Sequence, residues 1–97
     1  MSKYNFEFIS FHPVNIYSTG QVYFGPATIK DFGLDKIGLR WIEDKEKHVL
    51  ALMEDKNGRR LNGLKINCPI KVARRYVGNY SLVKEDGVFV LKANAEN

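Results

Sequence analysis

Positive charge is concentrated in residues 56–84, a stretch of 29 residues that carries eight Lys or Arg side chains and no acidic residue. The rest of the chain carries seven basic residues against all 11 acidic ones, so the net charge of +4 originates in this segment. Guanidinium and ammonium groups without local partners bind phosphates and carboxylates. The segment is therefore expected to attract a polyanion, and nucleic acid is the commonest polyanion in a cell.

The most specific pattern within this segment is a predicted amphipathic helix from Ile70 to about Val77. At 100° per residue, its three cations fall on one face and its five apolar residues on the other. We expect these cations, together with those of the preceding turn and strand, to contact the phosphate backbone of nucleic acid, with DNA favoured over RNA. The predicted binding residues are Arg59, Arg60, Lys65, Lys71, Arg74 and Arg75.

Other uses of the same cations stay open at this point. They can dock on an acidic protein partner, as small accessory or inhibitor proteins of phages and mobile elements do. They can also simply be solvated, or pair with acidic residues elsewhere in the chain. Exposed aromatic residues beside cations would instead indicate base stacking on single strands, and Tyr17, Tyr23 and Tyr80 are the candidates for it.

The remaining reactive residue types do not form a recognisable catalytic site. The acidic pairs, such as Glu43-Asp44, fall at predicted turns, where such residues are ordinary. His12 and His48 lack a partner at any known spacing, and Cys68 fits a buried structural cysteine better than a nucleophile. The sequence has no phosphate-binding loop, dinucleotide-binding or zinc motif. We therefore predict a protein that is not an enzyme and has no cofactor or metal.

Length and composition indicate one domain, residues 1–97, of 97 residues and 44% hydrophobic content. The longest apolar run, residues 49–53, is far shorter than a membrane span, and the first residues show no apolar signal region. With a single cysteine, no internal disulfide can form. These features predict a cytoplasmic protein without a membrane partner.

Strand and turn signals divide the chain into an N-terminal strand and two halves. Residues 4–11 alternate aromatic and polar side chains and predict a strand, which would also suit a homodimer interface. The first half, 14–54, predicts a hairpin (14–18 and 21–24), a short helix (27–32) between Pro26 and Gly33, and two strands (39–43 and 48–54). The second half, 55–92, is the basic one, and residues 93–97 predict a frayed tail.

The second half begins with the turn signal Asp55-Lys56-Asn57-Gly58 and continues with strand-like residues to Asn67. The predicted helix follows Pro69, and a hairpin of 80–83 and 88–91 ends the half. The Gly63-to-Pro69 offset repeats the Gly20-to-Pro26 offset, which suggests two pseudo-repeated halves. The predicted fold is mainly β with two short helices (α+β), as a small barrel or a strongly curved antiparallel sheet.

Residues 14–52 resemble the AbrB/SpoVT family of swapped-hairpin DNA-binding domains, over about 40 of the 97 residues. That family reads strand, turn, G-R-I-x-I-P, a short helix ending in L-G-L or similar, and two strands around an acidic turn. Here the corresponding residues are 19–26, then 27–34, then the strands 39–42 and 48–52. Gln21 stands where the family has a basic residue, and Gly25 is an extra residue before the proline.

The resemblance implies a cradle-loop barrel and a DNA-binding regulator. Family members pair two copies into one barrel as a dimer. A diverged second copy in residues 55–92 would let one chain close such a barrel alone. Because barrels of this kind serve several functions, the fold by itself does not choose among them.

Overall fold

The computed structural model describes residues 12–93 of the chain. These residues form seven strands, two α-helices and one 3-10 turn. In chain order they are β1 (Pro13–Ile16), β2 (Gln21–Phe24), α1 (Pro26–Phe32), η1 (Leu34–Lys36), β3 (Leu39–Asp44), β4 (Val49–Glu54), β5 (Lys65–Asn67), α2 (Ile70–Ala73), β6 (Gly78–Glu85) and β7 (Val88–Ala93). The predicted strand 4–11, and the dimer interface predicted on it, lie outside the described residues.

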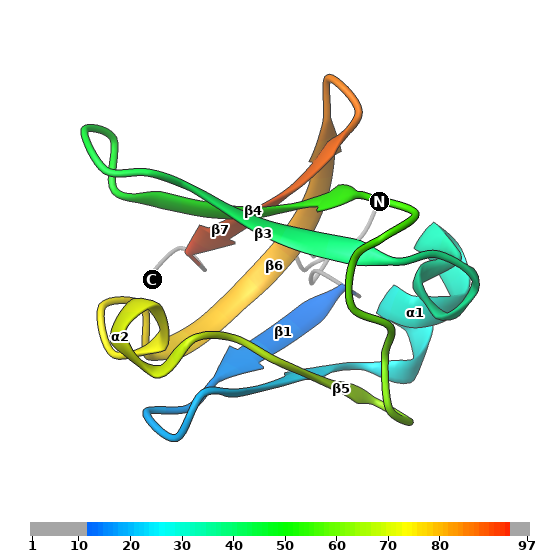
Figure 1. Cartoon of the computed structure of the whole chain (residues 1–97), viewed down its shortest axis with the longest axis horizontal. Coiled ribbons are helices and arrows are strands. Elements are labelled where there is room, and N and C mark those ends of the chain that lie inside the picture. Colours follow the sequence, from blue (N-terminus) through cyan, green and yellow to red (C-terminus); the bar gives the residue numbers. More distant parts are fainter. Residues whose placement is uncertain (1–11, 94–97) are drawn as a thin grey trace, which may run out of the picture.

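All seven strands belong to one antiparallel sheet in the order β3-β4-β7-β6-β1-β2-β5. The sheet curves strongly, with β3 and β4 on one side of the molecule and β1, β2 and β5 on the other, while the long strand β6 crosses between them (Figure 1). This arrangement confirms the predicted fold class, in its curved-sheet form.

The sheet curves because its strands bury alternate residues on one face. Val14 and Ile16 of β1 and Val22 and Phe24 of β2 are almost fully buried, whereas the residues between them are not. Leu52, Leu82 and the other buried apolar side chains of β3, β4, β6 and β7 complete the same core. Burying one face of a twisted sheet around a common core forces the sheet to wrap.

The two edge strands, β3 and β5, meet across the open side of the curved sheet. The Trp41 indole N–H of β3 donates a 2.9 Å hydrogen bond to the Asn67 carbonyl of β5. Leu39 and Arg59 exchange backbone hydrogen bonds of 2.7 and 2.8 Å next to this contact. The connection between β4 and β5 thus fills the gap that a further strand pairing would occupy in a closed barrel.

The helix predicted for 70–77 is wrong in length, because α2 ends at Ala73 after one turn. Its predicted apolar face is only partly inside: Ala73 and Tyr76 are buried, but Ile70 and Val77 are 49% and 53% exposed. The chain leaves the helix because β6 begins at Gly78, which pairs with Ile16 and has φ of 144°. Strand pairing thus ends the helix before its second turn.

The strand-like stretch predicted from the turn at Gly58 to Asn67 is largely wrong, because β5 comprises only Lys65–Asn67. The remaining elements lie close to their predicted bounds. Helix α1 begins at Pro26 and ends at Gly33, whose φ of 64° is the left-handed conformation of a glycine cap. Strand β6 begins two residues earlier than expected, and β7 continues to Ala93, the first residue of the predicted frayed tail. The rest of that tail, residues 94–97, lies outside the described residues.

The predicted repeat has a counterpart in the strand order, because β2 pairs with β5 and β4 with β7, as two related halves would require. The helices differ, since α1 has seven residues and α2 four.

Candidate nucleic-acid interface

Three of the predicted binding residues come together at one surface depression. Arg59, Arg60 and Lys65 line an open hollow of about 230 Å³ with the polar residues Gln21, Asn62 and Asn67. Strand β5 supplies Lys65, and the connection between β4 and β5 supplies both arginines. The backbone hydrogen bonds between Arg59 and Leu39 fix where this connection runs. The sheet edge and the connection therefore present three cations to the same space.

A second depression, of about 450 Å³, continues the first toward α2. The two share Gln21, Arg59 and Asn67, so they form one groove along the β2–β5 edge. The second part is lined further by Thr19, Gly20, Cys68, Pro69 and Ile70. We call the joined depressions the basic groove.

The basic groove is electrostatically one-sided. No acidic residue lines either depression. Within residues 12–93, neither Arg59, Arg60 nor Lys65 forms an ion pair. Their charges are therefore available to a ligand, and a concave surface lined by one sign of charge focuses the field on it.

The outer face of the sheet continues this surface with tyrosine and amide side chains. Tyr23 of β2 lies directly opposite Lys65 of β5 on one side and Asn15 of β1 on the other. Residues directly opposite in an antiparallel pair share a face, and this face is turned away from the core because Val14, Val22 and Ile66 fill the other. Tyr17 packs edge-to-face on Tyr23, with ring centroids 5.6 Å apart.

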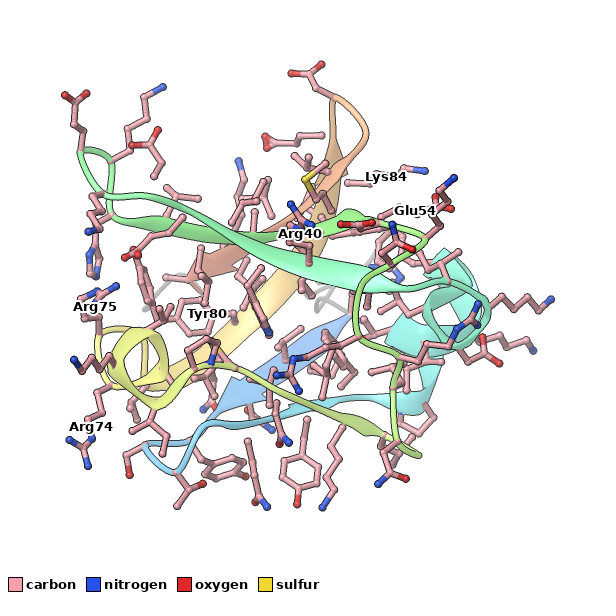
Figure 2. All side chains as sticks on the ribbon, viewed as in Figure 1. Arg40, Glu54, Arg74, Arg75, Tyr80 and Lys84 are labelled. Atoms are coloured by element: carbon pink, nitrogen blue, oxygen red, sulfur yellow. The ribbon has the colours of Figure 1, made fainter. Side chains whose placement is uncertain are left out.

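Lys71 and Arg74 lie beyond the end of the basic groove. Both are exposed, and neither lines a depression. Arg74 extends away from α2 and from the sheet (Figure 2). Neither residue forms an ion pair within the described part of the chain. They can extend the positive surface past Ile70, but they do not shape the groove.

Arg75 lies apart from the other predicted residues, between α2 and the β3–β4 hairpin (Figure 2). Its guanidinium donates two hydrogen bonds to the Glu43 carboxylate, of 2.7 and 3.1 Å, and a third to the Lys71 carbonyl. The hydrogen bond from Arg75 holds the pKa of Glu43 below its usual range, and the Tyr76 hydroxyl at 2.9 Å lowers it further. Arg75 is thus engaged within the protein, as a bidentate pair that joins α2 to β3.

Tyr76 anchors this junction from the interior side. Its ring is buried and stacks on the His48 ring at a centroid distance of 4.5 Å. Burial, with the nearby Glu43 carboxylate, raises the pKa of Tyr76 to about 12. Tyr80, a sequence candidate for stacking, lies opposite Val14 on the inner face, and burial raises its pKa as well. Neither ring lies on the outer face that carries Tyr23, and both line a separate hollow together with His48.

Cys68 is buried beneath the basic groove, where burial raises the pKa of its thiol to about 11. The thiol is therefore protonated at neutral pH and is a poor nucleophile. Across residues 12–93, no three His, Cys, Asp or Glu side chains gather as a metal site would require. In the same part of the chain, neither helix has the length and apolar character needed to cross a bilayer.

Sequence reasoning missed the amides of the groove: Gln21, Asn62 and Asn67. Their position depends on β2 pairing with β5, where Gln21 lies opposite Asn67. The available signal was alternation, since Gln21 and Tyr23 occupy the polar positions of a predicted strand. That alternation predicts that Gln21 and Tyr23 lie on the same face of the strand, but it does not predict that β5 pairs with β2.

Comparisons with protein-family models, with curated proteins and with solved structures found no match to this chain. The AbrB/SpoVT resemblance therefore stays a prediction.

Proposed function

We propose that this protein is a non-enzymatic nucleic-acid-binding module that holds the phosphate backbone in the basic groove. Arg59, Arg60 and Lys65 make the central contacts, and Lys71 and Arg74 add charge beyond the groove. The observation that carries the proposal is the convergence of three cations, none of them ion-paired with a described residue, in a groove without acidic lining.

The chemistry of the groove suits a phosphodiester chain. Arginine presents a planar fork of N–H donors that matches two phosphate oxygens, and lysine adds a point charge. The amides of Gln21, Asn62 and Asn67 add donors and acceptors beside these charges. Contacts of this kind set affinity and register on the backbone without specifying sequence. A regulatory role, as the AbrB/SpoVT resemblance implies, would need base contacts in addition.

The test is fluorescence anisotropy with labelled DNA across a salt series, on the wild type and two charge-reversal variants. We expect Arg59→Glu with Arg60→Glu to lower affinity by about 100-fold, at roughly tenfold per lost contact. Lys45→Glu with Lys47→Glu changes the net charge equally, but these lysines lie in the exposed β3–β4 turn. This control should change affinity little at about 0.1 M salt, where charges are screened beyond roughly 10 Å.

The absence of wild-type binding at low salt would overturn the proposal. Equal losses in the two variants would also overturn it, because they would assign binding to net charge rather than to the groove. Circular dichroism and urea unfolding of both variants establish that the fold is retained.

A second candidate function is docking on an acidic protein surface, and one observation favours it. Three apolar side chains are about half exposed near α2: Tyr17, Ile70 and Val77. Ile70 lies next to the turn at Gly20. Tyr17 directly follows Ile16 and Val77 directly precedes Gly78, and Ile16 and Gly78 are paired between β1 and β6. Exposed apolar side chains within a polar surface are typical of protein interfaces. Recovery of one acidic protein without nucleic acid, lost in Ile70→Ser with Val77→Ser, would favour this function.

A further inference from the structure

Tyr17 and Tyr23 lie on the outer face of the sheet, next to the basic groove. Tyr17 is 48% exposed and Tyr23 is partly exposed. Their rings meet at 85°, edge against face. In such a pair, unlike in a parallel stack, one ring covers only one face of the other, so the pair itself leaves the remaining ring faces uncovered.

One cation of the basic groove lies one strand away from one of these rings. Lys65 is directly opposite Tyr23 on the neighbouring strand β5. Gln21 accepts a long hydrogen bond of 3.4 Å from the Tyr23 hydroxyl and lines the groove together with Arg59. A nucleotide chain lying along β2 would therefore meet aromatic rings and phosphate-binding groups side by side, as single-strand-binding surfaces provide them.

The amides on this face suit base edges. Gln21 and Asn67 lie opposite each other, and Asn15 lies opposite Tyr23. An amide both donates and accepts, so it can pair with the edge of any unpaired base. In a duplex, base faces are covered by their neighbours and only groove edges are open. The basic segment contains one helix, α2, and its four residues are too short to read a major groove as recognition helices do.

We infer that the ligand of the basic groove is a single strand of nucleic acid, with bases stacked on Tyr17 and Tyr23. This inference rests on the proposed function and assigns its ligand form. The phosphates lie over Arg59, Arg60 and Lys65, and the bases turn toward the tyrosines. Aromatic stacking is tolerant of base identity, so the surface binds without strong sequence preference.

The experiment compares three labelled probes of equal length: a single-stranded thymidine oligomer, a mixed-sequence duplex and an abasic oligomer. Each is titrated with wild type, Tyr17→Ala, Tyr17→Phe and Arg59→Ala. We expect the thymidine oligomer to bind more tightly than the other two probes. Tyr17→Ala should weaken thymidine-oligomer binding by about tenfold and leave the abasic probe unchanged. Tyr17→Phe, which keeps the ring, should retain wild-type affinity.

Arg59→Ala should weaken all three probes, because it removes a phosphate contact common to them. Equal affinity for the oligomer and the abasic probe would overturn stacking while the proposed function stands. Tighter binding of the duplex would also overturn the inference alone. Failure of the wild type to bind any probe would overturn both proposals. Tyr23→Ala against Tyr23→Phe repeats the test on the second ring.

Discussion

The basic groove and the α2–β3 junction use the same residue types in opposite ways. In the groove, Arg59, Arg60 and Lys65 form no ion pair with a described residue and line open space. At the junction, Arg75 is held by Glu43, whose carboxylate also accepts a hydrogen bond from buried Tyr76. The sequence places both groups in one basic segment. The difference shows that a cation is available for binding only when the fold brings no carboxylate to it.

The aromatic residues repeat this contrast. At the junction, buried Tyr76 stacks on the exposed His48 ring, whereas Tyr17 packs on Tyr23 on the outer face of the sheet. One pair stabilises the fold, and the other extends the proposed interface. Substitutions in the junction should therefore change stability, and those at the outer face should change binding.

The largest expected effect is on stability at the junction. Tyr76→Ala removes a buried aromatic ring and should lower the free energy of unfolding by about 3–5 kcal/mol. Tyr17→Ala is the matched control, because the same change at an exposed ring should cost within about 0.5 kcal/mol. Urea unfolding followed by Trp41 fluorescence measures both. Similar losses of unfolding free energy at Tyr76 and Tyr17 would contradict the contrast between a stabilising junction and a surface that serves binding.

A second prediction concerns the turn that supports the groove. Gly20 has φ of 92°, and a Cβ there would lie 2.7 Å from the carbonyl oxygen of Cys68, which directly follows β5. Gly20→Ala should therefore cost about 1–3 kcal/mol and weaken DNA binding, since it forces β2 and β5 apart. Gly87 has a similar φ of 81° but open space around it. Gly87→Ala should destabilise the protein less than Gly20→Ala and leave DNA binding intact. A larger loss of stability or binding in Gly87→Ala than in Gly20→Ala would contradict this prediction.

A third prediction is a pH dependence that originates at the junction. The pKa of Glu43 is lowered in the folded state, chiefly by Arg75. A lowered carboxyl pKa contributes stability above its ordinary value of 4.5, and this contribution is lost as the pH falls through the folded-state pKa. Glu43→Gln should therefore reduce stability at neutral pH and flatten its decline in acid.

Urea midpoints measured from neutral to acidic pH check this prediction. The control is Glu46→Gln in the same hairpin, where the glutamate makes no ion pair within residues 12–93. If the urea midpoint of Glu43→Gln declined with falling pH as in the wild type, the Glu43–Arg75 pair would add nothing to stability.

The smallest expected effect is on DNA binding, and it distinguishes cations inside the basic groove from cations beyond it. Lys71 is exposed on α2 but lines neither depression, so Lys71→Gln should weaken DNA binding by only about twofold. Arg59→Gln, at the centre of the groove, should weaken it several times more. Anisotropy titrations at one low salt concentration rank the two variants. A larger loss at Lys71 would move the interface from the groove to α2.

Much of the fold could be predicted because its signals are local. Pro26 and Gly33 mark the ends of α1, and Gly87 marks the turn between β6 and β7. The length of α2 could not be predicted, because the pairing of Gly78 with Ile16, far along the chain, decides where the helix ends. Local periodicity does not contain that information.

The candidate site divides in the same way. The charge of Arg59, Arg60 and Lys65 is visible in the sequence, but their shared groove depends on strand β2 lying beside β5. Arg75 resembles them in sequence, and its partner Glu43 lies 32 residues away. Residue type predicted the chemistry, while long-range pairing determined which cations are free among the described residues.

The most direct test of this account is the salt dependence of single-stranded DNA binding in Arg59→Gln with Arg60→Gln, beside Arg75→Gln. We predict that the plot of log affinity against log salt becomes less steep by about 1.4 in the double variant, at roughly 0.7 per lost phosphate contact. In Arg75→Gln the slope should equal that of the wild type. A slope reduced in Arg75→Gln, or unchanged in the double variant, would contradict the assignment of binding to the basic groove.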